Sequence, residues 1–266
     1  MGGQWFFYIY DKRKQTVVEF SYLQPLARRT QIELPSASAN SFFSKGDFSI
    51  IMKCDDGRRA VKVSKADVVL LDAVLDSSSS EAMPFCCPTG ATGWTYTQKQ
   101  TMQKVTGRYV LDGLSVDISD AGGYLAATDD SCGFFRYKTS WHWLSLSARV
   151  SSGQTVGINF TLGANDGFGT DNTIWIDGAA HEMPAVMFEL VEQRMDSGVW
   201  RVYSADGSVN LTVTTSWSRR ESLNFFVAAS HFNQWVSQVR GRIVCTSQVL
   251  EFGGEMALLE KHFAKW

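Results

Sequence analysis

The sequence predicts an all-β protein built from two antiparallel barrels, with a short helix at the C-terminus. Apolar and polar residues alternate with a period of two from end to end, which is typical of strands with one buried face. Helical periodicity is nearly absent before the last residues. The 22 glycines mostly separate the alternating runs, and the 5 prolines avoid nearly all of them, as expected where the runs pair in a sheet.

The first two alternating runs predict a hairpin. Trp5, Phe7 and Ile9 alternate with other aromatic residues, and the polar segment 11–15 separates them from a second run over 17–22. Further strands are expected over 48–53, 59–63, 68–75, 94–104, 122–127, 141–150, 155–161, 173–177, 185–192, 199–203, 208–214, 223–231 and 234–245. Many short strands with meandering connections favour up-and-down barrels over other all-β folds.

Breaks in the pattern divide the chain into domains. The segment 76–90 contains four serines and two prolines and predicts a long loop. A second break in the alternation falls near 107–113, and we predict the domain boundary there. The predicted barrels then cover 1–107 and 108–266. Met256, Leu259, Phe263 and Trp266 follow two glycines at spacings near three and four, which predicts the C-terminal helix.

Composition argues against nucleic acid as a partner and against a location in the membrane. Lys and Arg total 25 against 27 Asp and Glu, so the net charge of -2 gives no positive electrostatic field that would attract nucleic acid. No stretch approaches the roughly 18 to 20 continuous apolar residues of a membrane span. The five cysteines are an odd number without a disulfide spacing, which indicates a reducing compartment. We therefore expect an intracellular, cytoplasmic protein with no membrane span, and nothing in these patterns specifies its oligomeric state.

Among the ionisable residues, aspartates are candidate catalytic acids, whereas the histidines do not predict a metal site. None of the 4 histidines shares a strand face with another at metal-ligand spacing, so no metal site is expected. The sequence also lacks a phosphate-binding loop, and no other cofactor is expected. A carboxylate beside tryptophans would be desolvated and its pKa raised towards useful acidity. The candidate acids are Asp129, Asp130, Asp171 and Asp177. Turn formation is the alternative, because aspartates at strand ends cap turns through their own side chains.

One strand face is unusual for a core. In the run 141–150, Leu144 and Leu146 share one face, while Trp141 and Trp143 share the other face with serines. Tryptophan among small polar residues suits a ligand cavity, and a solvated outer face is the alternative. Candidate ligand-binding residues on this and neighbouring segments are Tyr137, Trp141, Trp143, Asn159, Asn172, Trp175 and His231.

The segment 129–143, Asp-Asp-Ser-Cys-Gly-Phe-Phe-Arg-Tyr-Lys-Thr-Ser-Trp-His-Trp, resembles a motif of the uncharacterised DUF2804 family. Gly157-Ile158-Asn159-Phe160, the pair Asp171-Asn172 and the run Trp175-Ile176-Asp177-Gly178 follow in the family's order. Segments 96–99, 107–108 and 254–266 also match, so the resemblance covers most of the chain. Cys132 replaces an expected Arg, which removes a cation, and Asp171 replaces an expected Glu, which keeps the carboxylate.

This resemblance carries expectations about fold and activity. DUF2804 is similar to the double-lipocalin group that includes carotenoid 1,2-hydratase-like and AttH-like proteins, which implies two lipocalin-like antiparallel β-barrels. It implies further strands before Trp5, so the first barrel is expected to lack its initial strands. It also implies a lumen able to hold an apolar small molecule and, in some relatives, acid-catalysed hydration or cyclisation.

Three classes of function stay open on the sequence. The first is a non-enzymatic binder of an apolar or amphipathic small molecule in a barrel cavity. The second is a lyase or isomerase, hydratase-like or cyclase-like, that uses a buried carboxylate. The third is a structural or interaction protein whose strand edges or C-terminal segment dock a partner.

Overall fold

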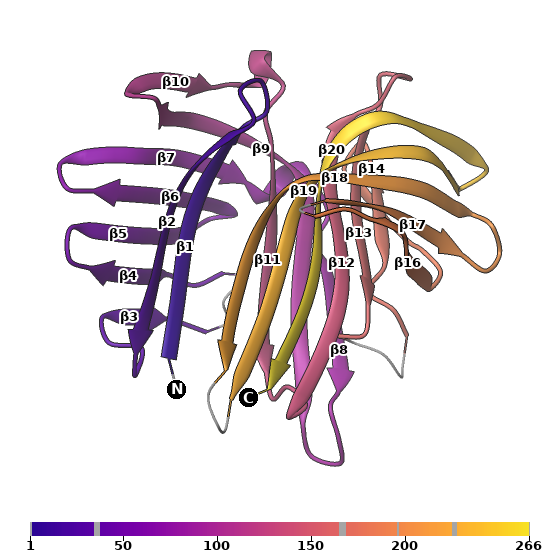
Figure 1. Cartoon of the computed structure of the whole chain (residues 1–266). Coiled ribbons are helices and arrows are strands. Elements are labelled where there is room, and N and C mark those ends of the chain that lie inside the picture. The colour runs from indigo at the N-terminus through magenta and orange to yellow at the C-terminus, as the bar shows by residue number, and fades with distance from the viewer. Residues whose placement is uncertain (1, 35–37, 165–168, 196, 225–227, 266) are drawn as a thin grey trace. The chain divides into compact units, whose positions relative to one another are not determined.

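The computed structural model describes residues 2–34, 38–164, 169–195, 197–224 and 228–265. These residues form strands almost throughout, and the only helical segments among them are the single turns η1 (Ser77–Ser79) and η2 (Asp120–Gly122) (Figure 1). The all-β fold class is therefore confirmed. No helix among the described residues is long and apolar enough to cross a membrane.

The chain divides into two compact units. Unit 1 comprises Met1–Ser79 and Gln103–Ala126, and unit 2 comprises Ser80–Met102 and Ala127–Trp266. Strand β9 (Trp94–Leu111) begins in unit 2 and ends in unit 1, and β11 (Leu125–Gly133) begins in unit 1 and ends in unit 2. Gly107, where the sequence places the boundary, lies within β9. The division at 107 and 108 stays a prediction about domains.

Unit 1 is one antiparallel sheet with a hairpin across it. Its strands are β3 (Thr30–Ile32), β4 (Ser41–Lys45), β5 (Phe48–Asp55), β6 (Arg58–Lys65), β7 (Val68–Asp76), the end of β9 and β10 (Leu114–Ile118). The hairpin of β1 (Gly2–Asp11) and β2 (Thr16–Pro25) confirms the first predicted element (Figure 1). Its Trp5 stacks on Phe43, with ring centroids 5.1 Å apart, and Tyr22 stacks on Phe48 at 4.6 Å. These rings belong to one of the two hydrophobic clusters formed by the described residues of unit 1, and the other contains Ala73, Leu75, Val105 and Ile118.

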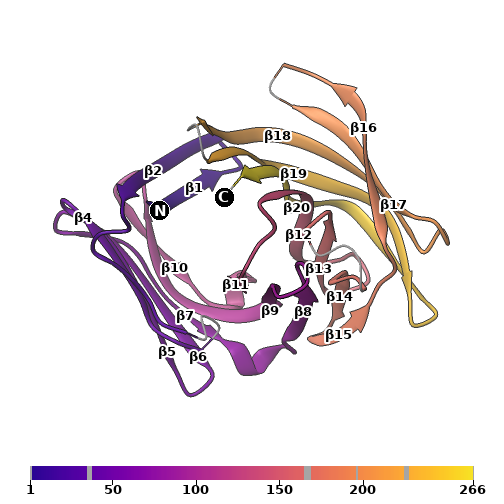
Figure 2. The same cartoon turned by 90° about the horizontal axis from the view of Figure 1, so that it is seen from below.

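Unit 2 is built on a strongly curled sheet of nine antiparallel strands. In spatial order they are β15 (Ala179–Glu182), β14 (Thr173–Ile176), β13 (Thr155–Leu162), β12 (Lys138–Arg149), β20 (Gln248–Lys265), β19 (Ala229–Cys245), β18 (Val209–Asn224), β17 (Gly198–Ser204) and β16 (Val186–Gln193). The sheet bends back so that β16 approaches β13 (Figure 2). Side chains such as Leu144, Ile158, Phe160 and Leu259, all fully buried, fill the inside of this curl.

The predicted C-terminal helix is wrong, because residues 248–265 form the central strand β20. This strand pairs with β12 on one side and β19 on the other. A register shift opposite Val239 and Arg240 interrupts the alternation of β20. Leu250 and Phe252 face the core before the shift, and Ala257 and Leu259 face it afterwards. Residues 252 and 257 both face the core although they are an odd number of positions apart, because a β-bulge lies between them. The period of two is thereby lost, and the apolar spacing in the sequence resembles that of a helix.

The sequence prediction also lacks four short strands, β3, β4, β10 and β15, and two of its other segments differ from the structure. The single strand expected over 223–231 is wrong, because Leu223 pairs antiparallel with Ser230 and the chain reverses between β18 and β19. Residues 225–227 of that segment lie outside the described residues. The predicted loop 76–90 contains the strand β8 (Met83–Pro88), which pairs with β9. Its prolines are compatible with a strand paired along one side only.

In unit 2, the segment before β8, the first half of β9 and the end of β11 lie against the outer face of β12, β13 and β14. The indole nitrogen of Trp175 donates to the backbone oxygen of Glu81 at 2.8 Å, and the Met102 amide donates to Ser147 Oγ at 3.3 Å. The unusual polar face predicted from the sequence therefore lies between two layers of unit 2. It is buried rather than solvated, since Asn159 is 1% exposed and Trp175 is fully buried.

Gly157 allows these two layers to approach closely. A Cβ atom at this position would lie 1.8 Å from Thr101 Oγ1 on β9. We expect Gly157→Ala to lower the free energy of unfolding by about 1 to 3 kcal/mol, the range for overpacking a filled core. Urea denaturation followed by tryptophan fluorescence measures this. Gly253→Ala is the matched control, because a Cβ there meets no atom closer than 3.9 Å. Equal stability of the two variants would contradict the close approach.

Candidate functional site

A pocket of about 270 Å³ lies within unit 2, between the covering strands and the curled sheet. Its aromatic walls are Tyr96, Phe135, Trp141 and Trp143. Its hydroxyl groups come from Thr95, Thr97, Ser131 and Thr161. Lys99, Asp129 and Glu260 supply ionisable groups, and Ala164 completes the described lining. The pocket therefore joins apolar rings with charge in one place.

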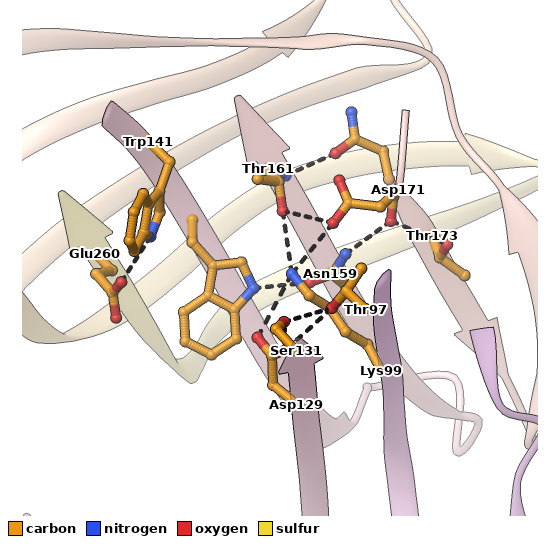
Figure 3. A network of polar contacts seen from close by, with 12 residues as sticks. Thr97, Lys99, Asp129, Ser131, Trp141, Asn159, Thr161, Asp171, Thr173 and Glu260 are labelled. Atoms are coloured by element: carbon orange, nitrogen blue, oxygen red, sulfur yellow. Dashed lines mark hydrogen bonds and ion pairs between the residues drawn. The ribbon is translucent and has the colours of Figure 1, made fainter. Parts of the chain in front are cut away.

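Lys99 is the centre of the charged network. Its side chain is 9% exposed, and its Nζ lies 3.2 Å from Asp171 Oδ2 and 3.5 Å from Asp129 Oδ2 (Figure 3). Nζ also donates to Thr161 Oγ1 at 3.4 Å. Burial alone would lower the pKa of Lys99, but the two carboxylates outweigh it and the pKa is raised above its usual value. Lys99 is therefore an ammonium group and not an amine nucleophile.

Asp171 and Asn172 anchor the start of β14 to β13. Asp171, with a side chain 2% exposed, accepts a hydrogen bond from Thr161 Oγ1 at 3.3 Å in addition to its ion pair. Asn172 Oδ1 accepts from the Thr161 amide at 2.6 Å, and its Nδ2 donates to the Pro184 carbonyl at 3.0 Å. The Asn172 side chain thus satisfies two backbone groups beyond the end of the β13–β14 ladder, while the Asp171 carboxylate bonds the side chains of Thr161 and Lys99.

Asn159 connects the aromatic wall to the charges. Its Oδ1 accepts from Trp143 Nε1 at 2.7 Å, and its Nδ2 donates to the backbone oxygen of Asp171 at 2.7 Å. The Lys99 ammonium lies over the Trp143 ring, 5.5 Å from its centroid. Trp143 is thereby held by a hydrogen bond at its edge and a cation at its face.

Strand β11 brings Asp129 and Ser131 to the pocket. Alternation along the strand places these two on the same face, so Asp130 lies on the other. Asp129 Oδ1 accepts from Thr97 Oγ1 and from Ser131 Oγ, each at 3.3 Å. Gly133 permits the close approach of β11 to β9, because its φ is +129° and a Cβ there would lie 2.3 Å from the Trp94 carbonyl oxygen.

Glu260 on β20 is a second, separate carboxyl in the pocket. It is 7% exposed, and its oxygens accept from Trp141 Nε1 at 2.8 Å and Gln234 Nε2 at 3.1 Å. Burial raises the pKa of Glu260 to about 6, and the two hydrogen bonds oppose that shift only in part. The His262 ring packs against Trp141, with centroids 4.3 Å apart, and so supports the indole that holds Glu260. Glu260 is thus a carboxyl group that exchanges its proton near neutral pH.

Titration of Glu260 should make stability depend on pH. Because the pKa of Glu260 in the folded chain, about 6, lies above the usual 4.5, its protonated form stabilises the fold at low pH. This contribution is lost as pH rises through about 6, and one and a half pKa units correspond to about 2 kcal/mol. The free energy of unfolding of the native chain minus that of Glu260→Gln should therefore fall by about 2 kcal/mol from about pH 4 to about pH 8. Parallel urea-denaturation curves across this range would contradict the assignment.

The structure brings six predicted residues together around one pocket. Asp129, Trp141 and Trp143 line the pocket. Asp171, Asn159 and Asn172 hold these walls from behind through the contacts described above. Residues separated by more than forty positions in the sequence thus share one site, and two of the four predicted acids are among them.

Five predicted residues lie elsewhere. Asp177, with a φ of +50°, occupies the turn after β14 and accepts from the Thr155 amide and hydroxyl, each at 2.8 Å. Asp130 lies on the far face of β11, and Tyr137 is 57% exposed. Trp175 is buried outside the pocket lining, and His231 bonds Ser222 Oγ at 2.8 Å. Their ligand and acid roles stay predictions.

Sequence reasoning missed Lys99 and Glu260. Lys99 lies in a correctly predicted strand, and it is the only charged residue between Glu81 and Lys104. That isolation, in a segment that also carries part of the family resemblance, was an available signal. Glu260 lies in the segment for which the sequence predicts a helix, and a helix there would not pair Glu260 with residues of β12 and β19.

Comparisons with known proteins agree with this fold. The family model described as "Domain of unknown function (DUF2804)" matches residues 2–266. Kievitone hydratase from Nectria haematococca is similar at 12% identity and a TM-score of 0.52, over 97% of this chain and 79% of that one. A putative AttH from Nitrosomonas europaea is similar at 13% identity and a TM-score of 0.52, over 94% and 77%. No curated protein matches the chain.

At these identities the two structures share a fold with the chain and support its lipocalin-like class. The family match spans nearly the whole sequence and confirms the resemblance found in its motifs. The chain therefore belongs to the DUF2804 family.

Proposed function

We propose that this protein binds an apolar or amphipathic small molecule in the pocket of unit 2. The observation that supports this is the convergence of four aromatic side chains with Lys99, Asp129 and Glu260 around one cavity of about 270 Å³. Binding sites for small molecules combine apolar walls with a few placed polar groups in this way. The inside of the curled sheet is a poorer candidate, because core side chains fill it.

A pocket-filling variant tests this proposal. Ala164 is a small, half-buried residue of the lining, so Ala164→Trp places an indole in the cavity without removing a charged group. Ala179→Trp makes the same change at an exposed position of β15. A ligand that binds only the folded state raises the melting temperature. Some members of a library of aromatic fragments should raise the melting temperature of the native chain and of Ala179→Trp, but not of Ala164→Trp. Fragments that act equally on all three proteins would refute the pocket.

A second candidate is a lyase or isomerase, and the position of Glu260 favours it, because this carboxyl is buried, lines the pocket and is hydrogen-bonded to Trp141. A general acid works best with a pKa near the working pH, and the pKa of Glu260 is raised to about 6. In a hydration, the Glu260 carboxyl would give its proton to one alkene carbon and water oxygen would bond to the other carbon. The water proton would then return to the Glu260 carboxylate. The faces of Trp141 and Trp143 and the charge of Asp129 would stabilise the developing cation.

The acid in this candidate differs from the aspartates predicted on the sequence. Asp129 and Asp171 are held by the Lys99 ammonium, whereas Glu260 accepts only neutral hydrogen bonds among the residues described. The similarity in fold to a hydratase is compatible with such chemistry and carries no substrate to this chain.

Turnover of aryl-conjugated alkenes tests the enzymatic candidate. Mass spectrometry should detect products heavier by one water molecule with the native chain. Glu260→Gln should lower the rate about a hundredfold or more, as expected on loss of a general acid. Glu251→Gln, an exposed glutamate on the same strand, is the control that should leave the rate unchanged. A Glu260→Gln variant as active as the native chain would exclude Glu260 as the acid.

A further inference from the structure

We infer that the pocket selects an organic cation, an ammonium group on an aromatic body, over an anion of similar size and shape. This inference rests on the proposed binding function and names its ligand class. It follows from three independent properties of the lining: the balance of charge, the use of hydrogen-bond donors and the orientation of the aromatic rings.

Negative charge exceeds positive charge around the cavity. The described lining contains one cation, Lys99, and two carboxylates, Asp129 and Glu260. A third carboxylate, Asp171, lies directly behind Lys99 at 3.2 Å. Since Lys99 is shared between Asp129 and Asp171, it leaves no positive charge to attract an anionic ligand. An anion entering this site would lose hydration and meet net repulsion.

The hydrogen-bond donors of the described lining are already committed. The three N–H groups of Lys99 have three acceptors, namely Asp129, Asp171 and Thr161. The Trp143 indole donates to Asn159 and the Trp141 indole donates to Glu260. Among the hydroxyls, Tyr96 donates to Gln98 Oε1 at 2.8 Å, and Thr97 and Ser131 bond Asp129. A ligand carboxylate would find no unengaged donor among these groups.

Acceptor capacity, in contrast, remains. A carboxylate offers about four lone-pair sites, and Glu260 receives two hydrogen bonds, from Trp141 and Gln234. No ion pair to Glu260 is formed by the described residues. A ligand ammonium would supply both the missing charge and additional N–H donors. Its desolvation would then be offset by a charge-assisted hydrogen bond to Glu260.

The aromatic rings are also arranged for a cation. Tryptophan faces attract cations most strongly among aromatic side chains, and Lys99 already lies over Trp143 at 5.5 Å. Trp141 is tied by its nitrogen to Glu260, so its ring stands beside a carboxylate (Figure 3). An aromatic ring with an anionic oxygen at its edge offers both a π face and a carboxylate to an ammonium group attached to an apolar body.

Three probes of one skeleton test the inference on the native chain. Isothermal titration at about pH 8, above the pKa of about 6 for Glu260, measures the affinities of phenethylamine, phenethyl alcohol and phenylacetate. We expect phenethylamine to bind about tenfold or more tightly than phenethyl alcohol, and phenylacetate to bind most weakly. If phenylacetate or the alcohol binds as tightly as the amine, the charge selection is overturned while the binding function stands. If none of the three binds, the proposed binding function itself fails.

A variant identifies the group responsible. Glu260→Gln should weaken phenethylamine about tenfold and leave phenethyl alcohol nearly unchanged, because only the amine uses the negative charge. Glu251→Gln removes an exposed charge from the same strand and should change neither affinity. Equal loss of both ligands in Glu260→Gln would show a structural role and overturn the assignment of Glu260 as the cation partner. The comparison of probes on the native chain does not depend on the folding of this variant.

Discussion

Replacing Lys99 by methionine should lower the free energy of unfolding by about 3 to 5 kcal/mol, because the substitution leaves a buried carboxylate without its cation. Asp171 is 2% exposed and lies 3.2 Å from the Lys99 ammonium. Methionine fills a similar volume, so the change removes the charge and its hydrogen bonds rather than the packing. Urea denaturation at neutral pH measures this difference.

The control and a second substitution separate charge from packing. Lys138→Met removes an exposed lysine in the same unit and should change stability by about 0.5 kcal/mol or less. Asp171→Asn added to Lys99→Met should restore part of the loss, about 1 kcal/mol or more, because the stranded charge is then removed as well. A double variant less stable than Lys99→Met would contradict the ion pair as the cause.

Trp175→Ala should lower the free energy of unfolding by a similar amount, about 3 to 5 kcal/mol, which is the range for deleting a large buried aromatic side chain. Trp175 is fully buried, and its indole nitrogen donates to the Glu81 carbonyl at 2.8 Å, which joins β14 to the covering strands. The substitution removes packing and leaves a carbonyl oxygen without this donor. Thermal and urea denaturation both measure the effect.

Trp94→Ala provides the comparison, because Trp94 is also in unit 2 but 43% exposed. Trp94→Ala should lower the free energy of unfolding by less than half as much as Trp175→Ala does. The sequence predicts Trp175 as a ligand-binding residue, and that role has a different signature. If Trp175→Ala kept the stability of the native chain but no longer bound phenethylamine, Trp175 would be a ligand contact instead of a joint between the layers.

Much of the fold was predictable because strand formation leaves a local pattern. Alternation over the run 141–150 separated Leu144 and Leu146 from Trp141 and Trp143, and the structure places these pairs on opposite faces of β12. The same rule assigned Asn159 to the face of the tryptophans. The pattern failed in β20, where a register shift changes which residues face the core.

The candidate site was predictable only in part. The tryptophans and Asp171 stood out because they are unusual residue types at strand positions, but nothing local links them to a lysine at position 99. Glu260 acquires its raised pKa from burial beside Trp141 and Gln234, which belong to two other strands. Burial is a property of the assembled layers, and it has no counterpart in the spacing of residues along β20.

The sequence by itself determined the all-β class, the first hairpin, most strands and the residues that share each face, because side-chain direction along a strand depends only on local geometry. It did not determine which second layer would cover the polar face of β12, β13 and β14. That was decided by tertiary structure, through the approach of β9 to Gly157 and of β11 to β9 at Gly133. This approach brings Lys99 to Asp171 and encloses the pocket. The ion pair and the buried lining both depend on contacts between segments that are far apart in the chain, so the sequence does not show them.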